Sequence, residues 1–290
     1  MTTIRPATPA DLGAIIAIAA ATGQDEDFEN DYPGYIDHLM AAGTLVVAQA
    51  GDAVAGFGGT MRLGSGADAV IMLTDLFVDP AAHGRGYGRA ILTVLWGDEA
   101  RKMTFASLHA SALPLYTSFG VSAWWPLLYL RGESARLAPP RGWSVTATTP
   151  ELAAELDLAW TGADRIGDYR LWAARPGGAA IIVGHEGRPM AAGATGGPRG
   201  EFGITHLALA PSAEGTEAAS AVQAAASWPR PPAPAVATGT GTAVICLPGP
   251  HPAVRPLLAA GWRVTGLDLH MASSPDLLDP LRAVPNPSLA

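Results

Sequence analysis

Residues 73–90 read Leu73-Thr74-Asp75-Leu76-Phe77-Val78-Asp79-Pro80-Ala81-Ala82-His83-Gly84-Arg85-Gly86-Tyr87-Gly88-Arg89-Ala90, and this stretch decides the fold. An apolar strand runs into three alternate glycines, after which apolar residues recur at helical spacing. Glycine lets the backbone turn tightly and leaves successive N–H groups uncovered by side chains. Those N–H groups and the positive end of the helix dipole converge on one point, where a phosphate group can bind. Arg85 and Arg89 add cationic donors to the turn.

Two common nucleotide-binding patterns do not fit this turn. A Rossmann dinucleotide site needs the spacing G-x-G-x-x-G directly after the first strand. Here the spacing is G-x-G-x-G, from Gly84 to Gly88, and several predicted strands precede it. A P-loop needs a lysine followed by serine or threonine, and that pair is absent from this turn. A tight strand-to-helix turn that binds nothing remains the structural alternative.

The periodicity of the flanking sequence predicts an α/β fold with a mixed sheet. The strands are predicted at 3–5, 45–50, 53–62, 70–78, 104–108 and 125–131, and the helices at 9–21, 35–42, 87–101 and 112–119. The first helix is expected to begin with a capping box of Thr8 and Asp11, with Pro9 at its first position. A turn at Gly51-Asp52 joins two strands as a hairpin.

Composition excludes several classes of protein. The chain has 290 residues, 49% of them apolar and 15% charged, which suits two globular domains. A net charge of −8 gives no basic face for nucleic acid or an anionic membrane. No apolar run reaches the length of a membrane span, and the apolar stretch 12–21 is preceded by a lone Arg5, unlike a signal peptide. The single cysteine, Cys246, suits the reducing cytoplasm.

The second half of the sequence repeats the first. Residues 74–80 recur as 205–211, Thr8-Pro9 recurs as Thr149-Pro150, and Ala112, Tyr116 and Gly120 recur as Ala253, Leu257 and Gly261. Three matches in the same order at offsets of 131 and 141 predict a duplicated domain. We expect one domain at 1–136 and a second at 141–290, joined by a Pro- and Gly-containing linker. The proline-rich stretch 229–234 belongs to the second copy alone.

The first half resembles the GNAT N-acetyltransferase superfamily, and the tandem arrangement resembles double-GNAT proteins. The family signature, Gln/Arg-x-x-Gly-x-Gly/Ala after Val-x-Pro, is matched by Val78-Asp79-Pro80 and by 83–88, with His83 in place of Gln or Arg. Residues 4–8 look like the family's opening strand, and 112–121 look like its closing Ala-x-x-x-Tyr-x-x-x-Gly motif. The resemblance covers about residues 2–133. It implies two domains, each with a mostly antiparallel central sheet flanked by helices.

The resemblance also implies roles for individual residues. The amides from Gly84 through Arg89 would hold the diphosphate of acetyl-coenzyme A, and backbone at Phe77 and Val78 would pair with its pantetheine arm. Tyr116 would protonate the departing thiolate. The implied cofactor-binding set is Phe77, Val78, His83, Gly84, Arg85, Gly86, Tyr87, Gly88, Arg89, His109 and Ser111, and no metal is expected.

Acyl transfer to an amine needs a neutral amine, a polarised carbonyl and a proton for sulfur. Asp75 is the candidate base, because strand alternation places it on the same face as Phe77. Asp75 could equally be a solvated carboxylate with no catalytic role. Tyr116 could equally be a tyrosine that only packs in the core. His109 is a rival base, and deprotonation through water with no dedicated base is equally admissible.

The acidic run 25–31 holds five carboxylates and borders the acceptor side in the family layout. It would attract a cationic amine, although a solubilising loop explains it as well. Trp124 and Trp125 could wall the acceptor pocket, and core packing is the simpler reading of both.

The second copy lacks the glycine turn. At an offset of 131, Gly86 corresponds to Glu217 and Gly88 to Ala219, and at an offset of 141 Tyr116 corresponds to Leu257. A glutamate beside the phosphate position would repel it, and leucine has no proton to give. We therefore expect the second domain to keep the fold without a cofactor site.

Two functional hypotheses follow. The first is an acetyl-coenzyme A-dependent N-acetyltransferase that acts on the primary amine of a small molecule or peptide. The second is a non-catalytic module that binds acyl-coenzyme A or senses amines. The sequence does not identify the acceptor, the acyl chain length or the oligomeric state.

Overall fold

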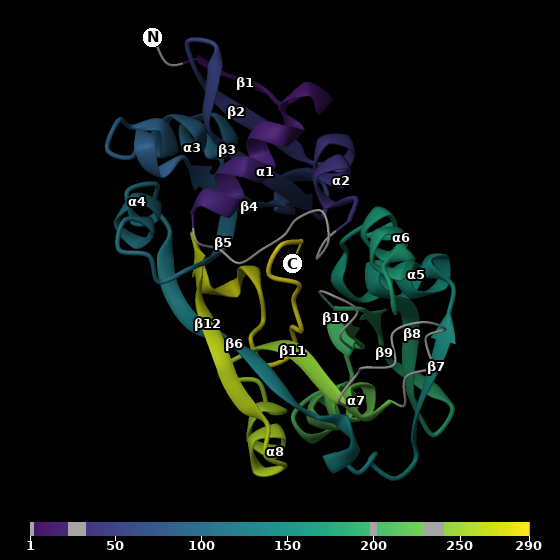
Figure 1. The fold of residues 1–290 in the computed structure, drawn as a ribbon. Helices are drawn as coiled ribbons and strands as arrows, with labels where there is room; N and C mark the ends of the chain where they lie inside the picture. Colours follow the sequence, from purple (N-terminus) through teal and green to yellow (C-terminus); the bar gives the residue numbers. More distant parts are fainter. Residues whose placement is uncertain (1–2, 23–32, 198–201, 229–240, 290) are drawn as a thin grey trace. The chain divides into compact units, whose positions relative to one another are not determined.

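The computed structural model describes residues 3–22, 33–197, 202–228 and 241–289, and the chain divides into two compact units (Figure 1). Unit 1 comprises Met1–Ala123, Met271–Leu277 and Leu289; unit 2 comprises Trp124–His270 and Leu278–Ser288. The chain therefore leaves unit 1 near the start of one strand, β6 (Ser122–Glu133), and returns to it near the end of another, β12 (Arg263–Ala272). The limits expected from sequence, 1–136 and 141–290, assign each of these strands to one domain throughout.

Unit 1 is built on a five-stranded sheet in the order β1-β2-β3-β4-β5. Its strands are β1 (Thr3–Pro6), β2 (Thr44–Ala50), β3 (Ala53–Leu63), β4 (Val70–Val78) and β5 (Lys102–Ala106), and its α-helices are α1 (Leu12–Ala21), α2 (Tyr35–Ala42), α3 (Tyr87–Trp96) and α4 (Ala112–Thr117). Neighbouring strands are antiparallel except β4 and β5, which are parallel. Residues 271–277 also belong to unit 1, and the Ser273 N–H donates to the Lys102 carbonyl.

Helices cover both faces of the unit 1 sheet. A methyl group added at Gly59 would meet Leu39 of α2, whereas one added at Gly58 would meet Ile91 and Leu95 of α3. Because successive residues of a strand face opposite sides, α2 and α3 lie on opposite faces. The apolar core contains Ile15, Phe57 and Met72, all fully buried.

Strand β4 contains an irregularity at Thr74 that positions the candidate site. Its register with β3 runs Thr60↔Leu73 and then Gly59↔Asp75, so Thr74 is an extra residue of the bulge type. Parallel pairing with β5 ends at Leu73↔Thr104. Beyond that point, one edge of β4 is not paired to β5.

Unit 2 repeats this design. Its strands are β6, β7 (Trp143–Thr148), β8 (Ala179–His185), β9 (Arg188–Thr195), β10 (Phe202–Leu209), β11 (Thr242–Pro248) and β12, and its α-helices are α5 (Pro150–Thr161), α6 (Ile166–Ala174), α7 (Thr216–Ser227) and α8 (Val254–Ala259). The strand order is β12-β6-β11-β10-β9-β8-β7. The parallel registers Ile71↔Lys102 and Phe202↔Ala243 are related by offsets of 131 and 141, as in the sequence repeat. This agreement confirms two sheets of mixed, mostly antiparallel strands.

The predicted elements of unit 1 are present in the structure, and several differ at their ends by a few residues. The helix at 35–42 and the strand at 70–78 have the expected bounds. The first helix begins with a 3-10 turn at Pro9–Asp11, where the Asp11 carboxylate accepts a hydrogen bond from Thr8 N–H. Helix α3 ends at Trp96 instead of continuing to 101, because Gly97 has a φ of +42° and closes it. The predicted strand at 104–108 starts two residues earlier, at Lys102.

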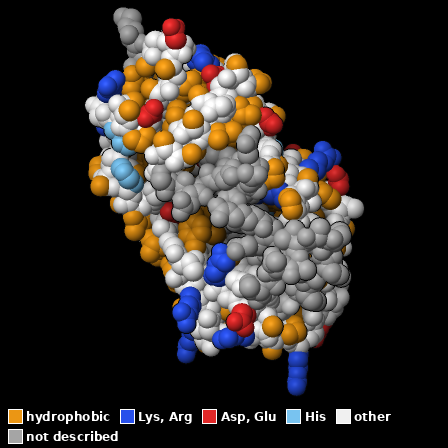
Figure 2. All heavy atoms as spheres, in the orientation of Figure 1, with side chains coloured by type: hydrophobic (Ala, Val, Ile, Leu, Met, Phe, Trp, Pro, Cys, Tyr) orange, Lys and Arg blue, Asp and Glu red, His pale blue; other side chains and the backbone are white. Residues whose placement is uncertain are grey.

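The distribution of basic side chains agrees with the net charge of −8. On the face drawn in Figure 2, basic side chains of the described residues stand singly or in small groups. Among the described helices, none combines the length and apolarity that crossing a membrane requires. The part of the chain that the structure describes contains no group of three or more His, Cys, Asp or Glu side chains arranged to hold a metal ion.

Candidate active site

The glycine turn follows the end of β4 and is held by local hydrogen bonds. The Asp79 carboxylate accepts from Ala81 N–H at 2.8 Å and so begins a 3-10 helix at Pro80–Ala82. Gly84 and Gly86 then have φ values of +75° and +84°, in the left-handed region that favours glycine. The space where their side chains would project is open to 4 Å. Both glycines are therefore required by the backbone, as the sequence predicted.

Helix α3 begins with free amides. Gly86 is the N-cap and provides no side-chain cap, and the first backbone bond of the helix runs from Ala90 N–H to the Gly86 carbonyl. Within the described residues, the N–H groups of Tyr87, Gly88 and Arg89 have no hydrogen-bond acceptor. Uncapped N–H groups at the positive end of a helix are suited to bind an anion.

The side chains around this turn have separate roles. The Tyr87 side chain is buried, so only its amide is available at the turn. A methyl group added at Gly88 would lie 3.4 Å from Leu115 of α4, at van der Waals contact distance, so Leu115 packs beside this position. Arg85 is exposed, whereas the Arg89 guanidinium donates to the Ser118 hydroxyl at 3.0 Å and lies over the ring of Phe119. Arg89 is thus oriented toward the end of α4.

The unpaired edge of β4 is partly closed by His83. Its Nε2 atom lies 2.9 Å from the Val78 carbonyl oxygen, so Nε2 carries the proton and donates. Leu76, two positions earlier on the same edge, lies beyond Leu73, the last residue of β4 that pairs with β5. The backbone groups of Phe77 point to the opposite edge, toward β3. Its ring stacks on that of Phe57, with the ring centroids 5.2 Å apart.

Asp75 lies in the interior and is bonded to Tyr35. Its exposed fraction is 7%, and the Tyr35 hydroxyl donates to its carboxylate at 2.6 Å. Burial raises the pKa of Asp75 to about 6, while the hydrogen bond from Tyr35 limits the rise. The regular register from Asp75 to Phe77 puts both side chains on the α2 face.

Tyr116 lies on the opposite face of the sheet. It is buried on α4 and meets the ring of Trp96, from α3, edge to face at 5.8 Å. Asp75 and Tyr116 are thus positioned by elements that cover opposite faces of the same sheet.

His109 and Ser111 bond to each other in the loop before α4. The Ser111 hydroxyl and backbone N–H lie 2.8 Å and 3.3 Å from His109 Nδ1, and both side chains are exposed. Nδ1 accepts these bonds, which fixes the imidazole within its own turn.

The remaining sequence candidates fall elsewhere. Trp124 is 43% exposed, and buried Trp125 stacks on His270 of unit 2 at 4.2 Å. The acidic run 25–31 and the proline-rich stretch 229–234 lie outside the residues that the structure describes.

Comparison with known proteins identifies the part of the chain that carries this turn. A family model of the acetyltransferase (GNAT) domain matches residues 41–121, which include β2 to β5, α3 and α4. Residues 41–121 are thus similar in sequence to a GNAT domain. No curated protein sequence matches the chain.

Solved structures share the fold over the whole chain at low sequence identity. The "Putative Acetyltransferase" of Pyrococcus horikoshii is 18% identical with a TM-score of 0.71, over 100% of this chain and 94% of its own. A GCN5-related N-acetyltransferase from Sphaerobacter thermophilus is 13% identical with a TM-score of 0.54, over 100% and 98%. A tandem GNAT protein from the clavulanic acid biosynthesis pathway is 14% identical with a TM-score of 0.53, over 95% and 100%.

The GNAT-like turn of unit 2 differs from that of unit 1. Gly215 is the N-cap of α7, the place that Gly86 holds in α3. The loop is therefore two residues shorter than the sequence offset implied, and Glu217 matches Gly88 instead of Gly86. Its first-turn amides are occupied, because Glu217 and Ala218 N–H donate to the Glu214 carbonyl.

The chain itself fills the GNAT-like strand edge of unit 2. Leu207 N–H donates to the Val284 carbonyl at 3.1 Å, and the Arg282 guanidinium donates to the Leu209 carbonyl at 3.0 Å. Val284 is 1% exposed and belongs to the apolar core of unit 2. At the repeat offset of 131, Leu207 and Leu209 correspond to Leu76 and Val78.

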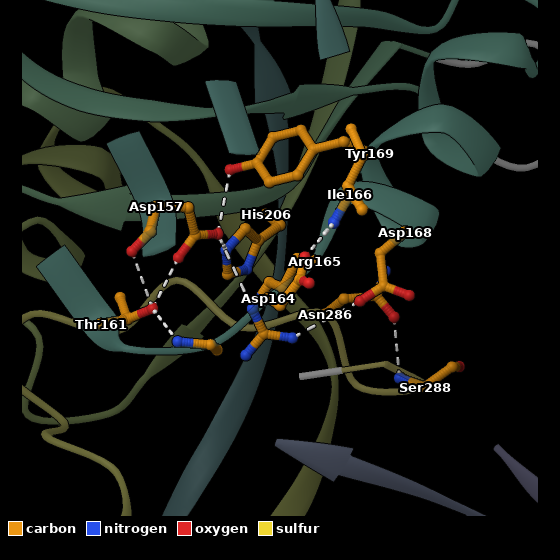
Figure 3. Close-up of polar contacts among 11 residues, drawn as sticks. Asp157, Thr161, Asp164, Arg165, Ile166, Asp168, Tyr169, His206, Asn286 and Ser288 are labelled. Atoms are coloured by element: carbon orange, nitrogen blue, oxygen red, sulfur yellow. Dashed lines mark hydrogen bonds and ion pairs between the residues drawn. The ribbon is translucent and has the colours of Figure 1, made fainter. Parts of the chain in front are cut away.

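Unit 2 also contains a buried polar cluster (Figure 3). Asp157 of α5 is fully buried; its carboxylate lies 2.9 Å from His206 Nε2 of β10 and accepts from the Tyr169 hydroxyl at 3.1 Å. The Arg165 guanidinium lies 3.7 Å from both Asp157 and Asp168. Although burial alone would raise the pKa of Asp157, its contacts with His206 and Arg165 lower it below the ordinary value. Burial and Asp157 raise the pKa of Tyr169.

Two of these contacts were missed by sequence reasoning. Tyr35 and Tyr169 each donate a hydroxyl to a buried carboxylate, 40 and 12 positions away in the sequence, and no local pattern signals either bond. His206 could have been found, because the offset of 131 maps Asp75 onto it. The strand position thus carries a titratable group in both units.

Proposed function

We propose that the chain is an acetyl-coenzyme A-dependent N-acetyltransferase whose reaction takes place in unit 1. The observation that carries this proposal is the set of three uncapped amides, at Tyr87, Gly88 and Arg89, beside the unpaired edge of β4. A GNAT family match over 41–121 supports the same reading.

In this proposal the turn binds the diphosphate of the coenzyme. The α3 amides offer directed donors and the helix dipole favours negative charge, so no metal is needed to hold it. Exposed Arg85 is free to approach the same charge. The edge of β4 between Leu76 and Val78 offers a backbone donor and acceptor to the pantetheine arm.

The acyl transfer requires two proton movements. The amine nitrogen forms a bond to the thioester carbonyl carbon, the carbon–sulfur bond breaks, and the sulfur takes a proton while the nitrogen loses one. We assign the proton donor to Tyr116, on the α3 face of the sheet. A backbone N–H at the β4 edge would stabilise the oxyanion, an effect worth about 3 kcal/mol.

Asp75 is the proposed base on the α2 face. A carboxylate whose pKa is about 6 is largely ionised at neutral pH and accepts a proton more readily than an exposed aspartate. Its hydrogen bond from Tyr35 fixes the side chain in the interior. The proposed acceptor is a primary amine of a small molecule or peptide, approaching from this face.

Unit 2 is proposed to keep the fold without a coenzyme site. Three features support this. The first-turn amides of α7 are occupied by the Glu214 carbonyl, the β10 edge is occupied by Arg282 and Val284, and Leu257 stands at the position of Tyr116.

The proposal is tested by screening amines with acetyl-coenzyme A and measuring release of free thiol. We expect turnover with at least one amine, and loss of that turnover in the D75N/Y116F double variant. Saturable binding of coenzyme A without turnover on any amine would favour the non-catalytic alternative. No binding at all would contradict the proposal.

A further inference from the structure

We infer that His83 is a removable cap on the edge of β4 and must release the Val78 carbonyl when the coenzyme arm binds. This inference rests on the proposed function, because the arm is the occupant for which the edge is kept open. It gives His83 a role that the backbone amides of the turn do not share.

The direction of the Val78 carbonyl follows from its neighbour. Asp79 N–H donates to the Ala55 carbonyl of β3 at 2.9 Å. In an extended strand, backbone groups of successive residues point to opposite edges. The Val78 carbonyl therefore points away from β3, toward the edge that β5 leaves unpaired. It is there that the His83 imidazole donates to it.

Unit 2 shows the same carbonyl capped in a permanent way. Ala210 N–H donates to Met190 of β9 at 2.9 Å, so the Leu209 carbonyl also points to the open edge. Arg282 donates to it, and two residues later Val284 pairs with Leu207 and is buried in the apolar core. An edge carbonyl at this position is thus bonded in both units, by side chains from different parts of the chain.

The two caps differ in what holds them. His83 is exposed, and among the described residues its side chain makes one hydrogen bond, to the Val78 carbonyl. Moving it costs one neutral hydrogen bond, which is replaced when an amide of the arm donates to the same oxygen. Moving Arg282 and Val284 would expose a buried apolar side chain as well. The cap of unit 1 can therefore open, and that of unit 2 stays closed.

Calorimetric titration of the full chain with two probes tests this inference. Coenzyme A carries the arm, whereas 3′-phosphoadenosine 5′-diphosphate carries the same diphosphate without it. We expect H83A to bind coenzyme A about three- to tenfold more tightly than the wild type, with unchanged affinity for the diphosphate probe. H83Q should behave as the wild type, since its amide can donate to the same carbonyl. H185A, which removes an imidazole stacked on Trp143 in unit 2, is the matched control and should change neither affinity.

Other outcomes separate the inference from the proposed function. If H83A weakens both probes equally, His83 binds the diphosphate and does not cap the edge. If H83A changes neither affinity, the bond to Val78 has no bearing on binding, and the inference fails while the proposed function stands. If the wild type binds neither probe, both the proposed function and this inference are wrong.

Discussion

The hydroxyl of Tyr35 donates a 2.6 Å hydrogen bond to the carboxylate of Asp75, joining a helix to a strand across 40 positions of sequence. Both side chains are buried, at 2% and 7% exposure. Burial destabilises the ionised carboxylate, and the hydroxyl offsets part of that cost. The pair therefore couples the protonation of one candidate catalytic group to the stability of unit 1.

The first prediction concerns stability. Because the pKa of Asp75 is about 6 in the folded chain and near 3.8 when exposed, the folded state holds an extra proton between these values. Stability should fall as the pH rises through this window and level off above about 6. D75N removes the effect, so it should be more stable than the wild type at pH 8, by up to about 3 kcal/mol, and not at pH 4. Thermal unfolding of both proteins across this range provides the measurement, and a constant difference in stability would contradict the shift.

A second prediction concerns the pH dependence of turnover. The bond from Tyr35 lowers the pKa of Asp75, so Y35F should raise it further. If Asp75 is the base, the acidic limb of the rate profile should lie near pH 6 in the wild type. It should move about one pH unit higher in Y35F. Steady-state rates measured from pH 5 to 9 test this, with D75N as the variant that should lose the limb. A limb that stays in place in Y35F would point to a base other than Asp75.

The third prediction separates catalysis from binding at Tyr116. Y116F keeps the ring that packs against Trp96 and removes the hydroxyl. We expect kcat to fall about 100-fold or more, with an unchanged dissociation constant for coenzyme A. Single-turnover kinetics and calorimetry on the same preparation give the two quantities. Unchanged kcat would remove Tyr116 from the mechanism.

The fold of unit 1 could be predicted from sequence because its signals are local. Val70–Val78 is a continuous apolar run stopped by Asp79-Pro80, and Tyr35–Ala42 has helical periodicity, so both bounds were correct. The end of α3 was placed five residues late, since residues 97–101 hold no proline and the left-handed Gly97 acts through its backbone alone.

The contacts of the candidate site were less predictable. The glycines of the turn could be predicted from the sequence, because Gly84 and Gly86 adopt positive φ values that other residues rarely adopt. The bonds from Tyr35 to Asp75 and from Arg282 to Leu209 join residues distant in sequence, and no periodic pattern encodes them. The loop before α7 is shorter than its counterpart before α3. A comparison at a constant offset of 131 could not detect this, and it paired Gly86 with Glu217 instead of Gly215.

A fourth prediction compares two matching amides. Leu207 N–H is bonded to Val284, whereas Leu76 lies on the part of the β4 edge that is not paired with β5. In hydrogen exchange followed by NMR, Leu207 should be protected with or without coenzyme A. Leu76 should exchange rapidly in the free protein and become protected when coenzyme A is added. Fast exchange of the Leu207 amide, or protection of the Leu76 amide that is the same with and without coenzyme A, would contradict the proposal that the β10 edge is filled and the β4 edge is open.

The most direct test of the central claim is the calorimetric stoichiometry of coenzyme A binding in the G86E variant. Gly51 provides the matched control, since it too has a positive φ, of +62°, with open space around it, in a hairpin turn of the same unit. We predict one coenzyme A per chain for the wild type and for G51E, and none for G86E. Two sites per wild-type chain, or undiminished affinity in G86E, would contradict the claim that the amides of the α3 turn hold the diphosphate.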